Sequence, residues 1–406
     1  MSGLLGFETG RVGLDRVVEL THRHLELDVV YIAELKDGRQ IFRAVAGDAA
    51  SFKVTVGDGP PAEATYCERL LTGELPNVIP DTAADDRVAH LPLTREARIG
   101  SFIGVPLRLS DQTIYGTLCG LGHTPDPTLD ERDVRFMSML AELVVFDLDE
   151  QRSLERVRAD IERVIETEDL DVAFQPVVDL KTNRCIGVEA LARFPAPFAS
   201  PDRTLLAADG LGLALELERL VVVQAWKVLA RLGPEQFLAL NLSPGALVEL
   251  AHRANLREDI ALDKVVVEVT EHAVVECYED LHRELKPLRE RGLRIAVDDA
   301  GAGYASLRHV LELRPDFIKV DRSLIHGIAD DHARRVAVGA FVTLAADLGA
   351  QVIAEGVERP VDLETVREMG LQAVQGYLLA RPTTDPEALA RWIGPAWAEP
   401  LAVLSG

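Results

Sequence analysis

The sequence lacks the marks of a secreted, membrane-spanning or zinc-thiolate protein. Its cysteines are widely separated and form no Cys-x-x-Cys pair, which argues against a disulfide framework and a zinc cluster; they are Cys67, Cys119, Cys185 and Cys277. No run of about 18 apolar residues is free of charge, and residues 1–15 show no basic segment followed by an apolar core. We therefore expect a cytoplasmic protein without a spanning helix or a secretion signal.

Positive charge is also scarce, since 43 lysines and arginines face 66 aspartates and glutamates and the formal net charge is −23. Such an excess repels nucleic-acid backbones and anionic membranes, so we expect neither a nucleic-acid polymer nor a membrane as a partner. The excess suits divalent cations, although most of the carboxylates are expected to be solvated surface. A chain of 406 residues, 48% of them hydrophobic, is typical of a globular protein with two or more domains.

The N-terminal part reads as short strands separated by turns. Turns such as Lys36-Asp37-Gly38 interrupt the apolar segments, and helical periodicity flanks them over residues 12–25 and 130–148. The expected strands cover residues 29–33, 42–45, 102–107 and 116–121. The pattern predicts an α+β domain over residues 1–148.

The helical pattern that begins near residue 130 continues almost to residue 167. In its second half the apolar residues alternate in spacings of three and four, as in a coiled-coil seam; they are Leu154, Val157, Ile161 and Val164. We interpret residues 149–168 as a linker helix that pairs with a second copy in a homodimer. The alternative is a helix that packs on its own domain.

Beyond Leu170 strands alternate with helices. The expected strands are 172–178, 187–193, 237–242, 265–269, 294–297, 317–320, 351–354 and 373–375. Eight such units predict a TIM (β/α)8 barrel, an α/β fold, over residues 169–406. A barrel of this kind places its chemistry at the C-terminal ends of its strands.

Nearly every expected strand carries a polar or charged residue at or near that end. They are Glu189, Asn241, Glu268, Asp298, Asp299, Lys319, Glu355 and Gln375. Burying one isolated carboxylate costs several kcal/mol, roughly, unless it is paired or bound to a metal. A turn, a salt bridge or a snorkelling lysine explains any one of these residues. None of these local explanations accounts for eight such residues that converge on one end of a barrel.

The chemistry of the set favours two hard cations. Acids and amides form an all-oxygen ligand set that suits Mg²⁺ or Mn²⁺, and His272 is then structural. An adjacent pair such as Asp298-Asp299 bridges two ions about 3.5–4 Å apart, as in enzymes that cut phosphodiesters. Lys319 is placed to orient the attacking water or to neutralise developing charge.

The motifs that carry these residues resemble the EAL phosphodiesterase family over about residues 155–400. In order, they are Phe174-Gln175-Pro176-Val177-Val178, Val188-Glu189-Ala190-Leu191-Ala192-Arg193-Phe194, Leu240-Asn241-Leu242-Ser243, Glu268-Val269-Thr270-Glu271, Asp298-Asp299, Phe317-Ile318-Lys319-Val320-Asp321, Ala354-Glu355-Gly356-Val357-Glu358 and Gln375-Gly376-Tyr377. The resemblance implies an EAL-type barrel that binds cyclic di-GMP and cuts it to linear pGpG.

The resemblance also implies roles for single residues. The metal ligands would be Glu189, Asn241, Glu268, Asp298 and Asp299, with Glu355 acting through water. Lys319 resembles the catalytic lysine, and Glu271 the glutamate that braces the loop after the fifth strand. Substrate contacts would come from Gln175, Arg193 and Gln375, of which Arg193 offers a guanidinium fork to a phosphate.

Two segments depart from the family pattern. Ala300 and Ala302 stand where the loop after the fifth strand usually has a phenylalanine and a threonine. This difference bears on the packing of the loop and on any dimer coupling through it. The segment 199–220 is shorter than usual and has Glu218 where an aspartate is common, which bears on the substrate mouth.

The N-terminal domain resembles a GAF domain, which implies a sensor that takes a small ligand. The motifs are Gly57-Asp58-Gly59, Tyr66-Cys67, Val78-Ile79-Pro80-Asp81, Ser101-Phe102-Ile103-Gly104-Val105-Pro106-Leu107 and Tyr115-Gly116-Thr117-Leu118-Cys119. For Cys67 a packed core thiol is favoured over a chromophore or redox site. Asp81 caps a turn or contacts a ligand.

Three functions remain open at this point. The first is an active phosphodiesterase regulated by the sensor domain, and it is favoured because all the expected metal ligands are present. The second is a catalytically inactive cyclic di-GMP receptor that acts through protein partners. The third is a dimeric scaffold, which leaves the acids at the strand ends unexplained.

Overall fold

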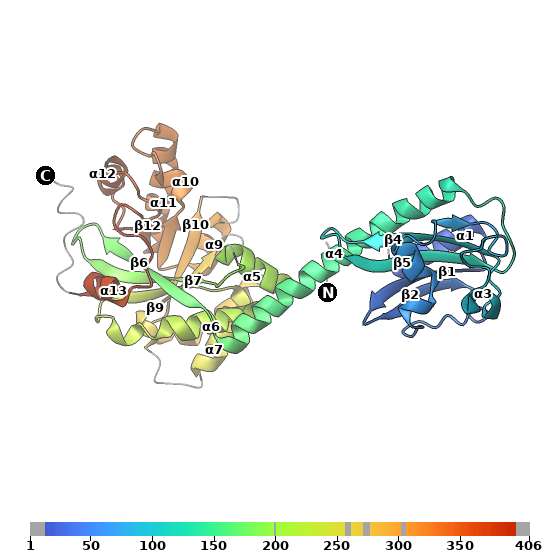
Figure 1. The fold of residues 1–406 in the computed structure, drawn as a ribbon. Helices are drawn as coiled ribbons and strands as arrows, with labels where there is room; N and C mark the ends of the chain where they lie inside the picture. Colours follow the sequence, from blue (N-terminus) through green and yellow to red (C-terminus); the bar gives the residue numbers. More distant parts are fainter. Residues whose placement is uncertain (1–12, 199, 256–260, 271–276, 302–305, 395–406) are drawn as a thin grey trace. The chain divides into compact units, whose positions relative to one another are not determined.

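The computed structural model describes residues 13–198, 200–255, 261–270, 277–301 and 306–394 (Figure 1). The chain divides into two compact units, Met1–Arg156 and Val157–Gly406. The first contains a five-stranded sheet and the second a closed eight-stranded barrel. This is the predicted combination of an α+β domain with a barrel. No helix in the described ranges has the length and apolar character needed to cross a bilayer.

The sheet of the N-terminal unit is antiparallel, with the strand order β2-β1-β5-β4-β3. Its strands are β1 (Val29–Lys36), β2 (Arg39–Gly47), β3 (Val78–Ile79), β4 (Ser101–Arg108) and β5 (Ile114–Gly122). Successive side chains of a strand point to opposite faces. Val30 and Ile32 accordingly join one apolar cluster, whereas Val29 and Tyr31 join another. The sheet is therefore covered on both faces.

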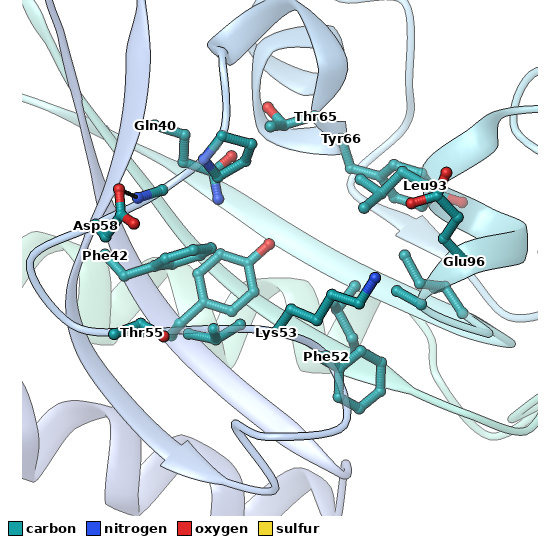
Figure 2. Close-up of a pocket in the computed structure, with 17 residues that line it drawn as sticks. Gln40, Phe42, Phe52, Lys53, Thr55, Asp58, Thr65, Tyr66, Leu93 and Glu96 are labelled. Carbon is teal, nitrogen blue, oxygen red and sulfur yellow. Dashed lines mark hydrogen bonds between the residues drawn. The ribbon is translucent and has the colours of Figure 1, made fainter.

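Different helices cover the two faces. Helix α1 (Leu14–Leu25) and the first part of α4 (Glu131–Thr167) pack on one face. The other carries α2 (Tyr66–Leu71), α3 (Pro92–Glu96), the 3-10 turn Ala62–Ala64 and a cavity (Figure 2). Cys67 is buried in that second cluster, and Asp81 accepts a hydrogen bond from the backbone N–H of Ala83. Both observations favour the structural interpretation of these two residues.

The barrel closes in the order β10-β11-β12-β13-β6-β7-β8-β9. Its strands are β6 (Asp171–Asp179), β7 (Cys185–Arg193), β8 (Phe237–Asn241), β9 (Val265–Thr270), β10 (Arg294–Ala300), β11 (Phe317–Val320), β12 (Gln351–Ala354) and β13 (Ala373–Val374). All eight lie where the sequence predicts strands.

One strand departs from a regular (β/α)8 barrel. β6 runs antiparallel to both of its neighbours, β7 and β13, while the other pairs are parallel. Only residues 180–184 separate β6 from β7. Parallel strands need a crossover of a dozen or more residues, so this short connection can only form a hairpin.

Helices surround the barrel, and an apolar core lies between them and the strands. They are α5 (Pro201–Gly210), α6 (Ala214–Trp226), α7 (Pro244–Asn255), α8 (Tyr278–Glu290), α9 (Ser306–Leu313), α10 (Arg322–Ile325), α11 (His332–Leu348), α12 (Pro360–Glu368) and α13 (Pro386–Ile393), with 3-10 turns at Leu229–Arg231 and Leu262–Lys264.

A second apolar layer fills the barrel interior near the strand beginnings. Phe237 and Phe317 form part of it, and the Arg294 guanidinium lies over both rings at 5.1 and 5.5 Å. This layer closes one end of the barrel. The carboxylates of Glu189, Glu268 and Asp298 lie on the other side of this layer, toward the strand ends.

The second half of α4 packs on the barrel unit itself. Ile161 and Val164 are 0% and 1% exposed and contact Leu217 and Leu220 of α6 through one cluster. The prediction that these residues form a dimer seam is therefore wrong, and the alternative holds. Heptad spacing shows which face of a helix is apolar. It does not show whether a second copy or the helix's own domain covers that face.

We predict that Ile161→Ala lowers the free energy of unfolding by about 2–5 kcal/mol, because it leaves a cavity in a closed cluster. Leu154→Ala on the same helix, where the side chain is 38% exposed, should cost less than about 1 kcal/mol. Urea unfolding followed by far-UV circular dichroism measures both, because Leu154 belongs to the N-terminal unit and Ile161 to the barrel unit, and this signal reports the helices of both. Equal losses would contradict the packing described.

Candidate functional site

The period-2 alternation of the barrel strands builds the site. In β9, Val266 belongs to the interior apolar layer and Glu268 follows two residues later on the same face. Phe317 and Lys319 stand in the same relation on β11, as Ala296 and Asp298 do on β10. A layer of polar side chains therefore lies directly above the apolar one, toward the strand ends.

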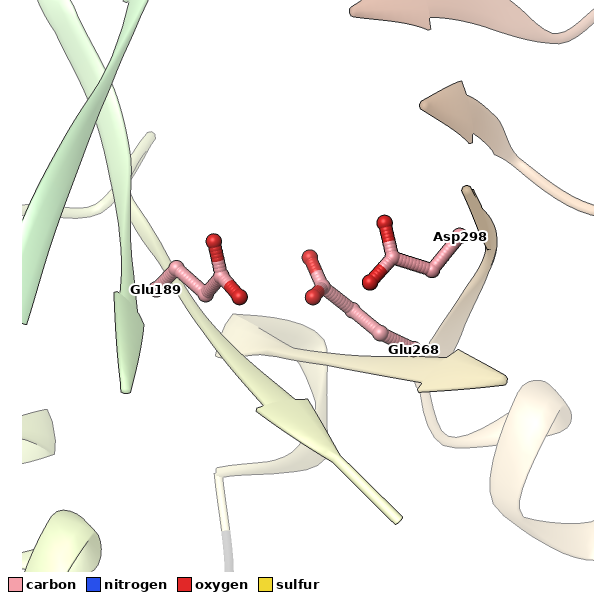
Figure 3. Close-up of side chains that lie close together, drawn as sticks. All are labelled: Glu189, Glu268 and Asp298. Atoms are coloured by element: carbon pink, nitrogen blue, oxygen red, sulfur yellow. The ribbon is translucent and has the colours of Figure 1, made fainter. Parts of the chain in front are cut away.

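The same construction places the other predicted residues. Glu189 lies on β7, Asn241 ends β8, Glu355 follows β12 and Gln375 follows β13. Figure 3 shows the carboxylates of Glu189, Glu268 and Asp298 turned toward one space inside the barrel. The predicted convergence of groups distant in the sequence is thus a feature of the structure.

Glycine at position 187 makes this layering possible on β7. A side chain there would start 2.5 Å from the ring of Phe237. Gly187 therefore leaves room for the phenylalanine that supports the floor beneath Glu189. This requirement comes from a neighbouring strand, so the local sequence gives no sign of it.

Lys319 lies at the centre of the acidic groups, with only 1% of its surface exposed. Its Nζ is 2.7 Å from Glu268 Oε2, 2.8 Å from Glu355 Oε1, 3.0 Å from Asp298 Oδ1 and 3.5 Å from Glu189 Oε2. Burial by itself lowers the pKa of this ammonium, but the four carboxylates outweigh burial and raise the pKa well above its usual value. The lysine therefore stays charged at neutral pH.

One ammonium does not balance four carboxylates. Burial raises the pKa of Glu268 and Glu355 well above the usual value, and neighbouring carboxylates raise both further. Asp298 shifts in the same direction, again chiefly through burial. The cluster thus carries more negative charge than a closed interior tolerates, and it favours the uptake of protons or cations.

Glu189 is the exception among the four acids. Burial raises its pKa, but Lys319 and the hydrogen bonds of two amides outweigh burial and lower it. Asn241 Nδ2 donates to Glu189 Oε1 at 2.9 Å, and Gln375 Nε2 donates to Oε2 at 2.6 Å. These amides hold the carboxylate ionised and fixed in orientation.

The carboxylates form two groups whose oxygen atoms lie within 4.8 Å of one another. Glu189, Glu268 and Asp298 form one, and Asp298, Asp299 and Glu355 form the other. The shared residue is Asp298. Hard oxygen donors packed around excess negative charge fit Mg²⁺ or Mn²⁺, and two groups that share one aspartate fit a pair of ions.

The predicted substrate residues are only partly gathered at this cluster. Gln375 Nε2 also donates to Gln175 Oε1 at 2.9 Å, so both glutamines adjoin Glu189. Gln375 Oε1 is buried and has no hydrogen-bond partner among the described residues. Arg193 ends β7 and donates to the backbone carbonyl of Ala192 at 2.8 Å. Glu271 lies outside the described residues, as does His272.

A buried contact that sequence reasoning did not assign supports the loop after β8. Glu218 of α6 accepts hydrogen bonds from the Ser243 hydroxyl at 2.8 Å and from its backbone N–H at 3.3 Å. Glu218 is 8% exposed, and burial raises its pKa. The contact anchors the chain two residues after Asn241. The sequence marks Glu218 as a departure from the family pattern, but it gives no sign of its partner Ser243.

Ala300, the first of the two unusual alanines, is the last residue of β10 and fits its place. Ala300 is 0% exposed and packs in the core between strands and helices, and its carbonyl accepts a hydrogen bond from the backbone N–H of Asp321. Asp299, next to it, has φ +54, a conformation that aspartate tolerates. Ala302 lies outside the described residues. The missing aromatic side chain therefore leaves no disturbance at position 300.

In comparisons with known proteins, a family model matches residues of each unit. A family model described as EAL domain matches residues 158–382, and one described as GAF domain matches residues 12–148. A cyclic di-GMP phosphodiesterase of Pseudomonas aeruginosa is 30% identical over 309 residues, which are 73% of this chain and 52% of that protein. The chain spans about half or less of the length of the first curated relatives it matches.

Solved structures resemble the barrel unit. The complex of the MucR phosphodiesterase with c-di-GMP is 30% identical, with a TM-score of 0.52 over 58% of this chain and 99% of that one. MucR is a protein of Pseudomonas aeruginosa. An EAL domain protein from Listeria monocytogenes is 26% identical, with a TM-score of 0.52 over 58% of this chain and 97% of that one.

We predict that Lys319→Met lowers the free energy of unfolding by about 3–5 kcal/mol in EDTA at pH 7, because it leaves buried carboxylates without their cation. Lys227→Met, at an exposed position, serves as the control and should change stability by less than about 0.5 kcal/mol. Urea denaturation measures both variants. A Lys319 variant as stable as the control would show that the ammonium does not balance the cluster.

Proposed function

The chain belongs to the EAL domain family, and from this we propose that it is a metal-dependent phosphodiesterase that hydrolyses cyclic di-GMP to linear pGpG. The observation that carries the proposal is the cluster of four carboxylates around Lys319, three of them buried and that of Glu355 half-buried. Cations bound at the strand ends of the barrel would balance this excess of acid oxygens and would act there on a phosphodiester.

We assign one ion to Glu189, Asn241, Glu268 and Asp298, and a second to Asp298, Asp299 and, through water, Glu355. When bound, the ions acidify water to give a nucleophile at neutral pH and stabilise negative charge on the phosphoryl oxygens. The two acidic groups that share Asp298 support this assignment. Mg²⁺ and Mn²⁺ both suit the oxygen donors.

The chain's own groups supply orientation and charge. Lys319 stays protonated among the acids, so it can orient the attacking water through its N–H bonds and offer positive charge to the phosphate. Glu355 lies 2.8 Å from Lys319 Nζ, and we assign it as the acceptor for a proton released by that water. In our assignment Glu271 braces the loop after the fifth strand.

Polar groups beside the cluster would hold the nucleotide. Arg193 offers a planar fork to a phosphate. Gln375 has a buried Oε1 without a partner among the described residues, which suits an N–H of the guanine base, and Gln175 lies beside it. A substrate held at several points brings its phosphodiester to the reactive groups in one orientation.

We further propose that residues 1–148 form a GAF sensor domain for a small ligand, that residues 149–168 connect it to the EAL domain, residues 169–406, and that the protein is a homodimer. A GAF family match over residues 12–148 supports the first part. The dimer contact would have to lie outside Ile161 and Val164, because the barrel unit already covers these residues.

The second candidate is an inactive cyclic di-GMP receptor. Purified protein incubated with cyclic di-GMP and Mg²⁺ or Mn²⁺, followed by chromatography, separates the two functions. We expect pGpG to appear only with the metal. Tight binding of cyclic di-GMP without any product would favour the receptor and overturn the enzyme.

We predict that Glu189→Gln lowers turnover at least about 100-fold with an unchanged circular dichroism spectrum, because it removes a charge that orders the metal group. Glu216→Gln, at an exposed position of α6, is the matched control and should keep full activity. Chromatographic rates at saturating Mn²⁺ give the comparison. Equal rates for the two variants would remove Glu189 from the site.

A separate prediction concerns Lys319→Met at saturating Mn²⁺. Turnover should fall at least about 100-fold, whereas the affinity for Mn²⁺ should stay the same or rise, because the ammonium competes with the ion for the same carboxylates. Calorimetric titration of Mn²⁺ beside the rate measurement tests this split. A parallel loss of both would contradict the role assigned to the lysine.

A further inference from the structure

A cavity of about 270 Å³ lies on the face of the N-terminal sheet that carries α2 and α3. Aromatic rings provide much of its wall, from Tyr31, Phe42, Phe52 and Tyr66. Figure 2 shows Phe42 and Gln40 on one side of this space and Leu93 and Glu96 on the other. A space of this volume is enough for a flat bicyclic ring.

One polar group inside the cavity is left without a partner. Gln40 is 2% exposed, and its Oε1 has no hydrogen-bond partner among the described residues. Figure 2 shows the amide turned toward the space between the rings. A buried amide oxygen without a donor is costly. A ligand that brings an N–H or O–H to this point relieves that cost.

The rim carries one positive and one negative group. Lys53 and Glu96 line the cavity, both are exposed, and no ion pair in the described part of the chain involves either. Asp58 also lines the cavity, but Arg39 pairs with it at 3.1 Å. Lys53 has φ +56, which a non-glycine residue seldom adopts. The rim thus offers one cation and one anion.

We propose that this cavity binds a free aromatic amino acid whose ring carries a hydrogen-bond donor, such as tryptophan. The ring lies among the aromatic side chains and donates its N–H to Gln40 Oε1. Lys53 faces the carboxylate of the ligand, and Glu96 faces its ammonium group. The inference deepens the proposed sensor role of residues 1–148 and depends on that role alone.

The charges argue against a nucleotide in this cavity. A phosphate group needs several N–H donors or cations, whereas the lining contains one lysine and two carboxylates, those of Asp58 and Glu96. A zwitterion matches a rim with one charge of each sign. Because both rim groups are exposed, water and salt screen them, and we expect the ring and Gln40 to dominate the specificity.

Calorimetric titration of the full chain with L-tryptophan, in the absence of cyclic di-GMP, tests the proposal. We expect one site per chain, and binding of L-phenylalanine at least about tenfold weaker, because phenylalanine leaves Gln40 Oε1 unpaired. Tryptamine lacks the carboxylate and indole-3-propionate lacks the ammonium group, so each should bind more weakly than tryptophan. Cyclic AMP and cyclic GMP represent the rival class.

Variants test which side chains contact the bound amino acid. Gln40→Leu, which keeps the volume, should remove the preference for tryptophan over phenylalanine. Lys53→Gln should weaken the binding of tryptophan about threefold and leave the affinity for tryptamine unchanged. Lys36→Gln, at an exposed position of β1, is the control for this variant. If Gln40→Leu does not fold, the ligand series on the wild-type protein and the Lys53 variant still test whether the cavity binds an aromatic amino acid.

Three results would overturn the proposal. They are no tryptophan binding at millimolar concentration by folded protein, equal binding of tryptophan and phenylalanine, or binding of a cyclic nucleotide that Gln40→Leu abolishes. Because the titration contains no cyclic di-GMP, its outcome is independent of phosphodiesterase activity. A failure of amino-acid binding and a failure of phosphodiesterase activity can therefore be told apart.

Discussion

The barrel unit is organised around a charge imbalance, since four carboxylates, three of them buried, surround one buried ammonium. At an effective dielectric constant of 20, two unit charges 4 Å apart interact by about 4 kcal/mol. Each acid beyond the first therefore carries a repulsive energy comparable with a large share of a domain's stability. The apolar floor with Phe237 and Phe317 below the cluster lets the fold hold these charges in place.

Much of this arrangement could be predicted from the sequence, because a barrel fixes where strand ends meet. Polar residues at the ends of apolar strands therefore had to converge, and Glu189, Glu268 and Asp298 do so. The antiparallel course of β6 could have been predicted from the short segment before β7, but a count of strands does not consider connection length.

Other features could not be read from the sequence, because they depend on contacts between distant segments. The apolar stripe of α4 showed that Ile161 and Val164 would be buried, but not against which partner. Gly187 is explained only by the ring of Phe237 on the neighbouring strand. The anchoring of Ser243 by Glu218 joins a helix to a loop 25 residues away. Short-range periodicity of the sequence does not predict such contacts between distant segments.

The two units share one physical theme, which is a buried polar group that the protein alone does not satisfy. In the barrel it is the excess negative charge around Lys319, and in the sensor unit it is Gln40 Oε1. Native proteins pair nearly all buried polar groups, and at these two places we propose that a ligand completes the structure.

In our proposal the acidic cluster of the barrel holds a pair of divalent ions. Crystals grown with Mn²⁺ and measured at the manganese absorption edge test this. We expect two anomalous peaks per chain, one beside Glu189, Glu268 and Asp298 and one beside Asp298, Asp299 and Glu355. An absence of peaks at these carboxylates, with Lys319 still in contact with all four acids, would contradict it.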